Sequence, residues 1–343
     1  MATYKLTPDT GEVSGTNTDM PLVVIPSELE IGTLSTAEAE SIRFYSDASL
    51  STELPREVVS ADEIHVKVSS VSSSTEIWAD YDGIRSDYAA TDTYGRNAVW
   101  GSEYRGVYHA GDSSTPLTDS TSNNNNATEG GSPTYQVAGS IGKAVSLDGN
   151  SDYFELGVGQ PSQIQIFGTL KINALPSNSG STYNNTYIDL GADGGKDTGI
   201  MLVAFVSDDN FYIRFGDSSQ FYTVDTGVSV TLGSFKRYVV SYASNGDLDF
   251  YIDGSNVFST NVGNGSIEPS TTRGEVIGFT SPLSGDNYAP IDFDEVYVVT
   301  GTPFSADWIS TEHNNQNDNA AFWVATEVET VTASPIAHIL QMI

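Results

Sequence analysis

Short runs in which apolar and polar residues alternate, separated by turn residues, fill the second half of this chain. Alternation with a period of two places the apolar side chains on one face of a β-strand. Runs of this length at this spacing are typical of an antiparallel β-sandwich, whose two sheets share one core. The sequence predicts strands at 144–147, 153–156, 164–172, 186–190, 200–206, 211–215, 221–225, 235–242, 248–252, 256–260, 274–279 and 291–299.

The amino-acid composition favours an all-β protein and excludes several kinds of function. The 343 residues are 38% hydrophobic and include 18 tyrosines and 14 phenylalanines, enough for more than one core. The net charge of −31 is spread over both halves, and the few basic residues do not cluster, so we expect no nucleic-acid partner. We interpret the charge as the solvated surface of a protein from a saline habitat. The absence of cysteine excludes disulfides and thiol catalysis.

The sequence contains no pattern typical of export or of membrane insertion. Its first residues lack the apolar stretch of a signal peptide. No apolar run approaches the roughly 18 residues that a membrane span needs. We therefore expect a protein that is made in the cytoplasm and is not exported by the general secretory route.

Four segments of the second half occur in the order that is typical of one known family. They are 141–156, 247–254, 291–298 and 303–316. Asp253-Gly254 predicts a tight hairpin turn, and Ser305 is a suitable N-cap for a short helix. Together these segments resemble laminin-G-like domains, which have the concanavalin A-like jelly-roll fold. The resemblance implies a large jelly roll that ends in one short helix, a fold found in sugar-binding modules, adhesins, virion proteins and some glycanases.

A second resemblance covers roughly residues 20–110. The matching segments are 41–47, 52–55 and 77–83, and Val107-Tyr108-His109 stands where the family has Val-Trp-His. These segments resemble the DUF2341 family, although Tyr81-Asp82-Gly83 replaces its usual Tyr-Gly-Asn. The resemblance implies a small antiparallel sandwich directly before a laminin-G-like domain. Within it we expect 63–68 to be a strand with its polar residues, Glu63, His65 and Lys67, facing outward.

The predicted chain is therefore all-β, a small antiparallel β-sandwich followed by a larger concanavalin A-like jelly roll with one short C-terminal helix. Residues 1–20 are an N-terminal arm or a first edge strand. The low-complexity stretch, with its asparagine run at 123–126, predicts a solvated linker. The expected segments are 1–20 (arm), 21–110 (DUF2341-like sandwich), 111–138 (polar linker or loop), 139–327 (jelly roll) and 328–343 (tail).

Catalysis is not expected. Glycanases of this fold carry an E-x-D-x-x-E strand, and the nearest segment, 292–295, has the wrong spacing. Asp294 and Glu295 are adjacent on a strand and should point to opposite faces, so they cannot act as a facing pair. The sequence has no Gly-x-Ser-x-Gly motif, and its histidines, His65, His109, His313 and His338, are scattered.

Several loop residues are candidates for binding. Lectin-like sites stack aromatic rings on sugars and bind hydroxyls with amides and carboxylates. Residues of these types predict a glycan site at Tyr183, Asn184, Asn185, Tyr187, Asp286, Asn287 and Tyr288. Asp189, Asp193 and Asp197 flank a glycine-rich loop and are candidate ligands for Ca²⁺, the ion that laminin-G-like domains often hold. Asp148-Gly149-Asn150-Ser151-Asp152 is better interpreted as a turn.

The favoured hypothesis is a non-enzymatic virion structural protein, a capsid decoration or tail-fibre component, that contacts a glycan or a host surface. Its expected location is the virion surface. Its expected partners are other virion proteins or its own copies in a homo-oligomer. The apolar end of the tail (Ile336, Ile339, Leu340 and Ile343) either packs on its own sandwich or docks on another subunit. The alternatives are an extracellular carbohydrate-binding or adhesion module and, disfavoured, a glycoside hydrolase.

Overall fold

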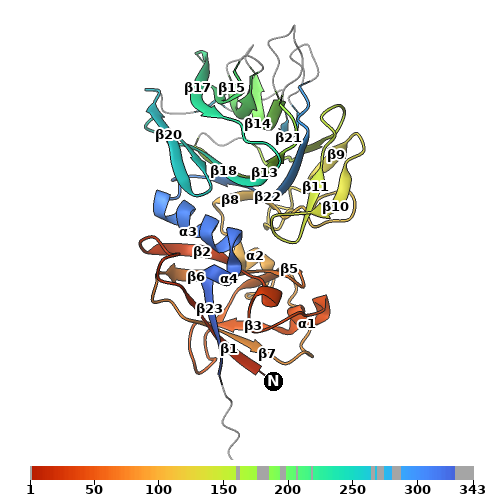
Figure 1. Ribbon diagram of the computed structural model, residues 1–343, viewed down its shortest axis with the longest axis vertical. Coiled ribbons are helices and arrows are strands. Elements are labelled where there is room, and N and C mark those ends of the chain that lie inside the picture. The colour runs from red at the N-terminus through yellow and green to blue at the C-terminus, as the bar shows by residue number, and fades with distance from the viewer. Residues whose placement is uncertain are drawn as a thin grey trace, which may run out of the picture.

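The computed structural model describes residues 2–159, 163–175, 185–193, 198–205, 208–217, 219–263, 267–268, 274–279 and 287–328. The protein is mostly β, with antiparallel sheets, a concanavalin A-like sandwich region and one longer C-terminal helix, which confirms the predicted fold class. Figure 1 shows two sandwiches stacked along the long axis, with the helices α3 (Ala306–Asn317) and α4 (Asn319–Phe322) between them.

The larger sandwich consists of two facing antiparallel sheets. Its inner faces enclose one core of aliphatic and aromatic side chains, among them Phe154, Phe211 and Phe293. One sheet has the order β10 (Thr134–Ala138), β11 (Lys143–Ser146), β22 (Ile291–Thr300), β13 (Ile164–Ile172), β18 (Phe235–Tyr242), β19 (Asp247–Ile252) and β20 (Ser255–Asn261), and β8 (Tyr104–Tyr108) also pairs with β22. The other has the order β17 (Phe221–Ser229), β16 (Asn210–Gly216), β15 (Thr198–Ala204), β14 (Asn185–Asp193), β21 (Glu275–Ile277), β12 (Tyr153–Glu155) and β9 (Thr128–Gly130).

The turn and the helix cap that were predicted for this sandwich are both present in the structure. Asp253 and Gly254 both adopt positive φ, 49° and 72°, in the turn between β19 and β20. A Cβ on Gly254 would lie 3.1 Å from the Cα of Ser310, so helix α3 packs directly against this turn. The Ser305 hydroxyl accepts a hydrogen bond from the Trp308 amide at 3.2 Å and caps α3 as expected.

The smaller sandwich joins the two ends of the described chain. Strand β1 lies between β7 and β23, so the N-terminal segment forms an internal strand. Thr3 pairs with Val328, and Pro8 with Trp323. One sheet of the smaller sandwich has the order β23 (Trp323–Val328), β1 (Ala2–Pro8), β7 (Ile77–Tyr81), β3 (Arg43–Tyr45) and β4 (Glu53–Leu54). The other sheet has the order β2 (Asn17–Val24), β6 (Glu63–Val71) and β5 (Arg56–Ser60). The sheets are flanked by the short helices η1 (Pro26–Glu28), α1 (Thr36–Ser41) and α2 (Arg96–Val99).

The segment predicted as a solvated linker, 111–138, is ordered and contributes β9 and β10 to the larger sandwich. The asparagine side chains of this segment form hydrogen bonds within the protein. The Asn123 side chain donates to the Tyr104 carbonyl at 3.0 Å, and the Asn125 side chain donates to the Arg105 carbonyl at 2.8 Å. The buried Asp119 carboxylate accepts from the backbone amides of Val107 and Asn125. Side-chain amides and a carboxylate thus supply the hydrogen bonds that a polar loop needs to lie along a strand.

The two sandwiches share a second core rather than a thin contact. This core joins Leu22 and Val66 of the smaller sandwich to Phe167 and Tyr297 of the larger one. Helix α3 lies along the edge strand β2, where the Asn315 side chain accepts from the Val23 amide at 2.6 Å and donates to its carbonyl at 3.0 Å. Asparagine amides here take the place of a neighbouring strand.

Candidate functional site

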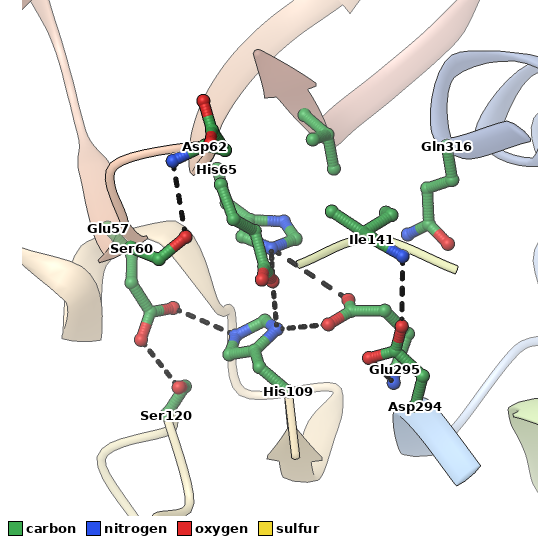
Figure 2. A network of polar contacts seen from close by, with 12 residues as sticks. Glu57, Ser60, Asp62, His65, His109, Ser120, Ile141, Asp294, Glu295 and Gln316 are labelled. Atoms are coloured by element: carbon green, nitrogen blue, oxygen red, sulfur yellow. Dashed lines mark hydrogen bonds and ion pairs between the residues drawn. The ribbon is translucent and has the colours of Figure 1, made fainter. Parts of the chain in front are cut away.

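A cluster of buried titratable side chains lies where the two sandwiches meet. Glu63 and His65 come from β6 of the smaller sandwich, Glu295 comes from β22 of the larger one, and His109 follows β8 directly. Figure 2 shows the side chains of His65, His109 and Glu295 converging on one point from these different elements. We call these four residues the junction cluster. Its members are 0–5% exposed, so water is almost excluded from them.

The polar atoms of the junction cluster are in mutual contact. Nε2 of His65 lies 3.1 Å from Oε1 of Glu63 and 3.8 Å from Oε2 of Glu295. Nδ1 of His109 lies 3.3 Å from Oε1 of Glu63 and 2.7 Å from Oε1 of Glu295. The two imidazole rings have centroids 4.4 Å apart. Two nitrogens and two carboxylates therefore surround one small volume.

A second layer of residues holds the cluster in place. Nε2 of His109 lies 3.3 Å from the Glu57 carboxylate, which also accepts from the Trp100 indole at 2.6 Å and from the Ser120 hydroxyl at 2.5 Å. On the other side, the Tyr297 hydroxyl donates to Glu295 and accepts from the Gln316 amide at 2.9 Å. Within the described part of the chain, Nδ1 of His65 has no hydrogen-bond partner.

The two histidines have opposite electrostatic surroundings. Burial, reinforced by the charge of His109, lowers the pKa of His65 to about 4. Burial also opposes the charge on His109, but the carboxylates of Glu295 and Glu57 outweigh it and hold the pKa of His109 well above its usual value. In the absence of another cation, one neutral and one protonated imidazole therefore share the site at neutral pH.

Glu57 and Asp294, which adjoin the cluster, also have opposite shifts. Burial would raise the pKa of Glu57, but the charge and hydrogen bond of His109 outweigh burial, so the pKa lies below its usual value. Burial raises the pKa of Asp294 well above its usual range, and repulsion by Glu295 and Glu63 adds to the rise. Asp294 therefore keeps its proton to a higher pH than an ordinary aspartate does, whereas Glu57 ionises more readily than an ordinary glutamate.

A β-bulge in β22 brings Glu295 into the junction. Phe167 on β13 pairs with Tyr297 and Thr169 pairs with Asp294, so one residue of β13 faces two of β22. Glu295 has a φ of 37°, and both Asp294 and Glu295 are completely buried. That Asp294 and Glu295 cannot act as a facing catalytic pair stays a prediction, and both side chains lie in the interior of the protein.

A buried ion pair lies beside the cluster. The Arg237 guanidinium contacts the Glu312 carboxylate of α3 and donates to the carbonyl of Glu295 and, at 3.0 Å, to the hydroxyl of Thr169. It also lies over the ring of Tyr297, 4.6 Å from its centroid. This pair fixes α3 to the larger sheet and closes the junction on that side.

The arrangement can hold a metal ion, because one ligand atom from each of the four side chains lies within 4.8 Å of every other. The cluster was not predicted from the sequence. The histidines are scattered along the chain, but His65 and His109 are in contact in the folded protein. Glu63 and His65, which were expected on an outer face, are 1% and 0% exposed, because the second sandwich covers that face. The Glu-x-His spacing on one strand was the available signal, since it puts both side chains on the same face.

The residues predicted to bind a glycan do not form one exposed set. Tyr187 is completely buried, and Asn185 and Asn287 are 6% and 3% exposed. Tyr288 is half-buried and stacks on Phe279 with ring centroids 4.3 Å apart. Tyr183, Asn184 and Asp286 lie outside the described residues.

The predicted calcium ligands and the predicted docking tail can be placed only in part. Asp189 is buried in β14, and its carboxylate accepts from the Ala192 amide at 2.7 Å. The side chain of Asp193, the whole of Asp197 and the tail residues Ile336, Ile339, Leu340 and Ile343 lie outside the described residues. Asp148, by contrast, accepts from the amides of Asn150, Ser151 and Asp152, which is turn chemistry.

Comparisons with known proteins bear on the larger sandwich. The family model of the concanavalin A-like lectin/glucanases superfamily (Laminin_G_3) matches residues 148–310, a little under half of the chain. No curated protein sequence matches. The resemblance of residues 21–110 to the DUF2341 family stays a prediction. In the part of the chain that the structure describes, no helix combines the length and apolar character of a membrane span.

Solved structures with a similar architecture include domain 4 of AbnA, a GH43 extracellular arabinanase from Geobacillus stearothermophilus, in complex with arabinotriose. It is 22% identical, with a TM-score of 0.48 over 64% of this chain and 98% of that one. The binding domain of Paraclostridial Mosquitocidal Protein 1 is 15% identical (TM-score 0.47, 62% of this chain and 52% of that one). The receptor-binding domain of botulinum neurotoxin mosaic serotype C/D is 13% identical (TM-score 0.46, 62% and 51%). The chain thus spans about half the length of the two toxin domains.

Proposed function

Because residues 148–310 form a concanavalin A-like lectin domain, we propose that this protein is a non-enzymatic binding protein that attaches to a glycan or to a glycan-bearing host surface. The family match is the observation that carries the proposal. The jelly roll supplies a rigid scaffold, and loops at its rim supply the contacts. The smaller sandwich and the junction then connect this domain to the rest of the assembly.

Three aromatic rings at one edge of the larger sandwich form the surface that we assign to the glycan. The Phe279 ring packs against Tyr288, with ring centroids 4.3 Å apart, and against Tyr153, with ring centroids 5.3 Å apart, and the two tyrosine centroids are 6.3 Å apart. All three side chains are half-buried, so they combine fixed positions with accessible edges. Aromatic rings of this kind can pack against the apolar face of a sugar ring.

The non-enzymatic part of the proposal rests on the burial of the nearest candidate carboxylates. A glycosidase needs two carboxyl groups that flank the scissile bond from opposite sides. Asp294 and Glu295 are completely buried at the junction of the sandwiches, where a sugar chain has no access. The alternative of a glycoside hydrolase is therefore disfavoured for this pair.

The same proposal places the protein on a virion surface, as a capsid decoration or tail-fibre component made in the host cytoplasm. A cysteine-free chain supports this setting, because it needs no oxidising compartment to fold. Its partners would be other virion proteins or further copies in a homo-oligomer, with Ile336, Ile339, Leu340 and Ile343 as the docking segment. The alternative setting is extracellular, as an adhesion module of a bacterial surface protein.

Two measurements test the proposal together. A glycan array with the purified protein, followed by a reducing-sugar assay on each bound glycan, should show binding without release. Release of reducing sugar would establish the hydrolase instead, and the absence of both binding and release would contradict a glycan-binding role. Mass spectrometry of purified particles should detect the protein; its presence in the culture medium and absence from particles would contradict the virion setting.

We also propose that the glycan-binding loops hold a calcium ion, with Asp189, Asp193 and Asp197 as its ligands. The buried carboxylate of Asp189 is a hard oxygen donor of the type that Ca²⁺ prefers. Glycan binding should then weaken when calcium is removed with EGTA and return when calcium is added. Binding that EGTA leaves unchanged would contradict a calcium requirement.

A further inference from the structure

We propose that Glu63, His65, His109 and Glu295 bind one zinc ion that fastens the two sandwiches together. The proposal concerns the junction, not the glycan-binding edge, and it stands independently of the proposed function. It rests on the ligand geometry, the charge of the site, the second layer of contacts and a route of entry.

The contacts between nitrogen and oxygen atoms of the cluster are close to the spacing of ligands in a tetrahedral zinc site. Zinc bonds to nitrogen and oxygen of about 2.0–2.1 Å place tetrahedral ligands about 3.3 Å apart. The contacts between imidazole nitrogens and carboxylate oxygens here are 3.1, 3.8, 3.3 and 2.7 Å. These contacts lie on either side of the tetrahedral spacing, and one ligand atom from each residue lies within 4.8 Å of every other.

The charge of the site favours a cation. The carboxylates of Glu57, Glu63 and Glu295 surround the two imidazoles in a region with almost no water. The positive charge of a Zn²⁺ ion would offset part of this concentration of carboxylate charge. Since an uncompensated buried charge is strongly destabilising, the ion improves the balance.

Around His109 and Glu295, the second layer has the form that is usual at zinc sites. A histidine that binds zinc usually donates its other ring N–H to a carboxylate, which orients the ring. Nε2 of His109 faces Glu57 at 3.3 Å, and Glu57 is itself held by Trp100 and Ser120. Tyr297 and Gln316 orient Glu295 in the same way. Nδ1 of His109 and the oxygens of Glu295 are thus aimed at the centre of the cluster.

Zinc fits these ligands better than calcium does. Calcium takes six to eight oxygen ligands, whereas this cluster offers two nitrogens and two carboxylates. Four protein ligands without an open position are typical of a structural zinc site rather than a catalytic one. Because the ligands come from β6, β22 and the end of β8, the ion would connect both sandwiches.

A surface pocket provides a route to the site. It has a volume of about 190 Å³, and Glu57, His109 and Ser120 are among the residues that line it. His109, 5% exposed, is the most accessible member of the junction cluster, whereas His65 and Glu295 are 0% exposed. An ion entering through this pocket would meet the imidazole of His109 first.

The test is the zinc content of the full chain, produced without a histidine tag, dialysed against zinc sulfate and then desalted. Mass spectrometry of the metal should find about one zinc per chain. Glu63→Gln and His65→Gln should each lose this zinc, whereas His313→Gln, which changes a histidine outside the cluster, should retain it. Circular dichroism and gel filtration of every variant check that it is folded.

If the ligand variants fail to fold, X-ray absorption of the zinc-loaded wild-type protein replaces them. It should show nitrogen and oxygen neighbours with the multiple scattering of two imidazoles. A wild-type protein that retains no zinc, a zinc content unchanged in both ligand variants, or a zinc spectrum without imidazole scattering would overturn the proposal. Retention of manganese or iron in preference to zinc would overturn the identity of the ion.

Discussion

His65 of the smaller sandwich and His109, at the end of a strand of the larger one, lie with their ring centroids 4.4 Å apart. The Trp100 ring packs beside both, at 5.3 Å and 5.6 Å. These contacts join the polar side chains of the cluster to the core that the two sandwiches share. The junction is therefore part of the folded interior, and changes within it should affect the stability of the whole chain.

Glu57→Leu should destabilise the protein strongly. The substitution removes the acceptor for Trp100, Ser120 and His109 and leaves their donors buried. We expect a loss of about 3–5 kcal/mol in the free energy of unfolding, measured by urea denaturation with tryptophan fluorescence. Glu57→Gln keeps the shape and one acceptor oxygen and should lose less. Equal losses in the two variants, both of which lack the carboxylate charge, would contradict the role of the acceptor oxygen.

Removing Arg237 alone should lower the stability of the protein more than removing Arg237 and Glu312 together. Arg237→Leu leaves the Glu312 carboxylate, 1% exposed, without its countercharge. We expect this variant to lose about 3–5 kcal/mol of stability in guanidinium denaturation. The double variant Arg237→Leu/Glu312→Leu removes both charges and should recover part of that loss. A double variant less stable than Arg237→Leu would show that the pair does not act through compensation of charge.

His313 should make stability depend on pH in the weakly acidic range. Burial lowers the pKa of His313, and Arg237 and Lys236 lower it further, against an opposing effect of Asp253. The unfolded chain therefore takes up this proton at a higher pH than the folded protein does. The contribution of neutral His313 is complete above the unfolded pKa near 6.5 and is lost as the pH falls from there towards the lower folded pKa.

The measurement is the free energy of unfolding across this pH range for the wild type and for His313→Gln. The variant cannot bind the proton, so its stability should fall less as the pH decreases. One titrating group changes the slope of the unfolding free energy against pH by at most about 1.4 kcal/mol per pH unit. Parallel curves for the two proteins would contradict the lowered pKa.

Leu6→Ala should lower the stability of the protein, because Leu6 lies in the strand that pairs the two ends of the described chain. Leu6 in β1 is completely buried, and its loss leaves a cavity in the shared core. We expect a loss of about 2–5 kcal/mol in chemical denaturation. The neighbouring Lys5→Ala is the control, because Lys5 and its partner Glu76 are 38% and 42% exposed and should contribute less than about 1 kcal/mol. Similar effects at the two positions would argue against a structural role for this strand.

Tyr288→Ala should weaken glycan binding without unfolding the protein. The substitution removes the ring that stacks on Phe279 at the proposed glycan-binding edge. We expect a loss of about tenfold in affinity, measured by titration calorimetry with a glycan identified on the array. Tyr45→Ala, a half-buried tyrosine of the smaller sandwich, is the control and should bind normally. Unchanged binding by Tyr288→Ala would move the glycan site elsewhere.

Much of the fold follows from local chemistry. The predicted strand 164–172 coincides with β13, and 235–242 coincides with β18, because alternation of apolar residues needs no knowledge of distant partners. The Asp253-Gly254 turn and the Ser305 cap were predictable for the same reason, since positive φ and free amide groups are properties of a few adjacent residues. The asparagine run was less predictable, because the carbonyl groups that Asn123 and Asn125 contact belong to β8.

The junction cluster could not be predicted in this way. Alternation along 63–68 distinguishes two faces of a strand, but it does not indicate that a second sandwich covers the polar one. The bulge that buries Glu295 depends on how β22 pairs with β13, and the position of His109 depends on the addition of β8 to the same sheet. Burial of a charged side chain is favourable only when partners from other strands compensate it. Local sequence therefore specified the strands and turns, whereas the closure of the sheets brought distant glutamates and histidines together.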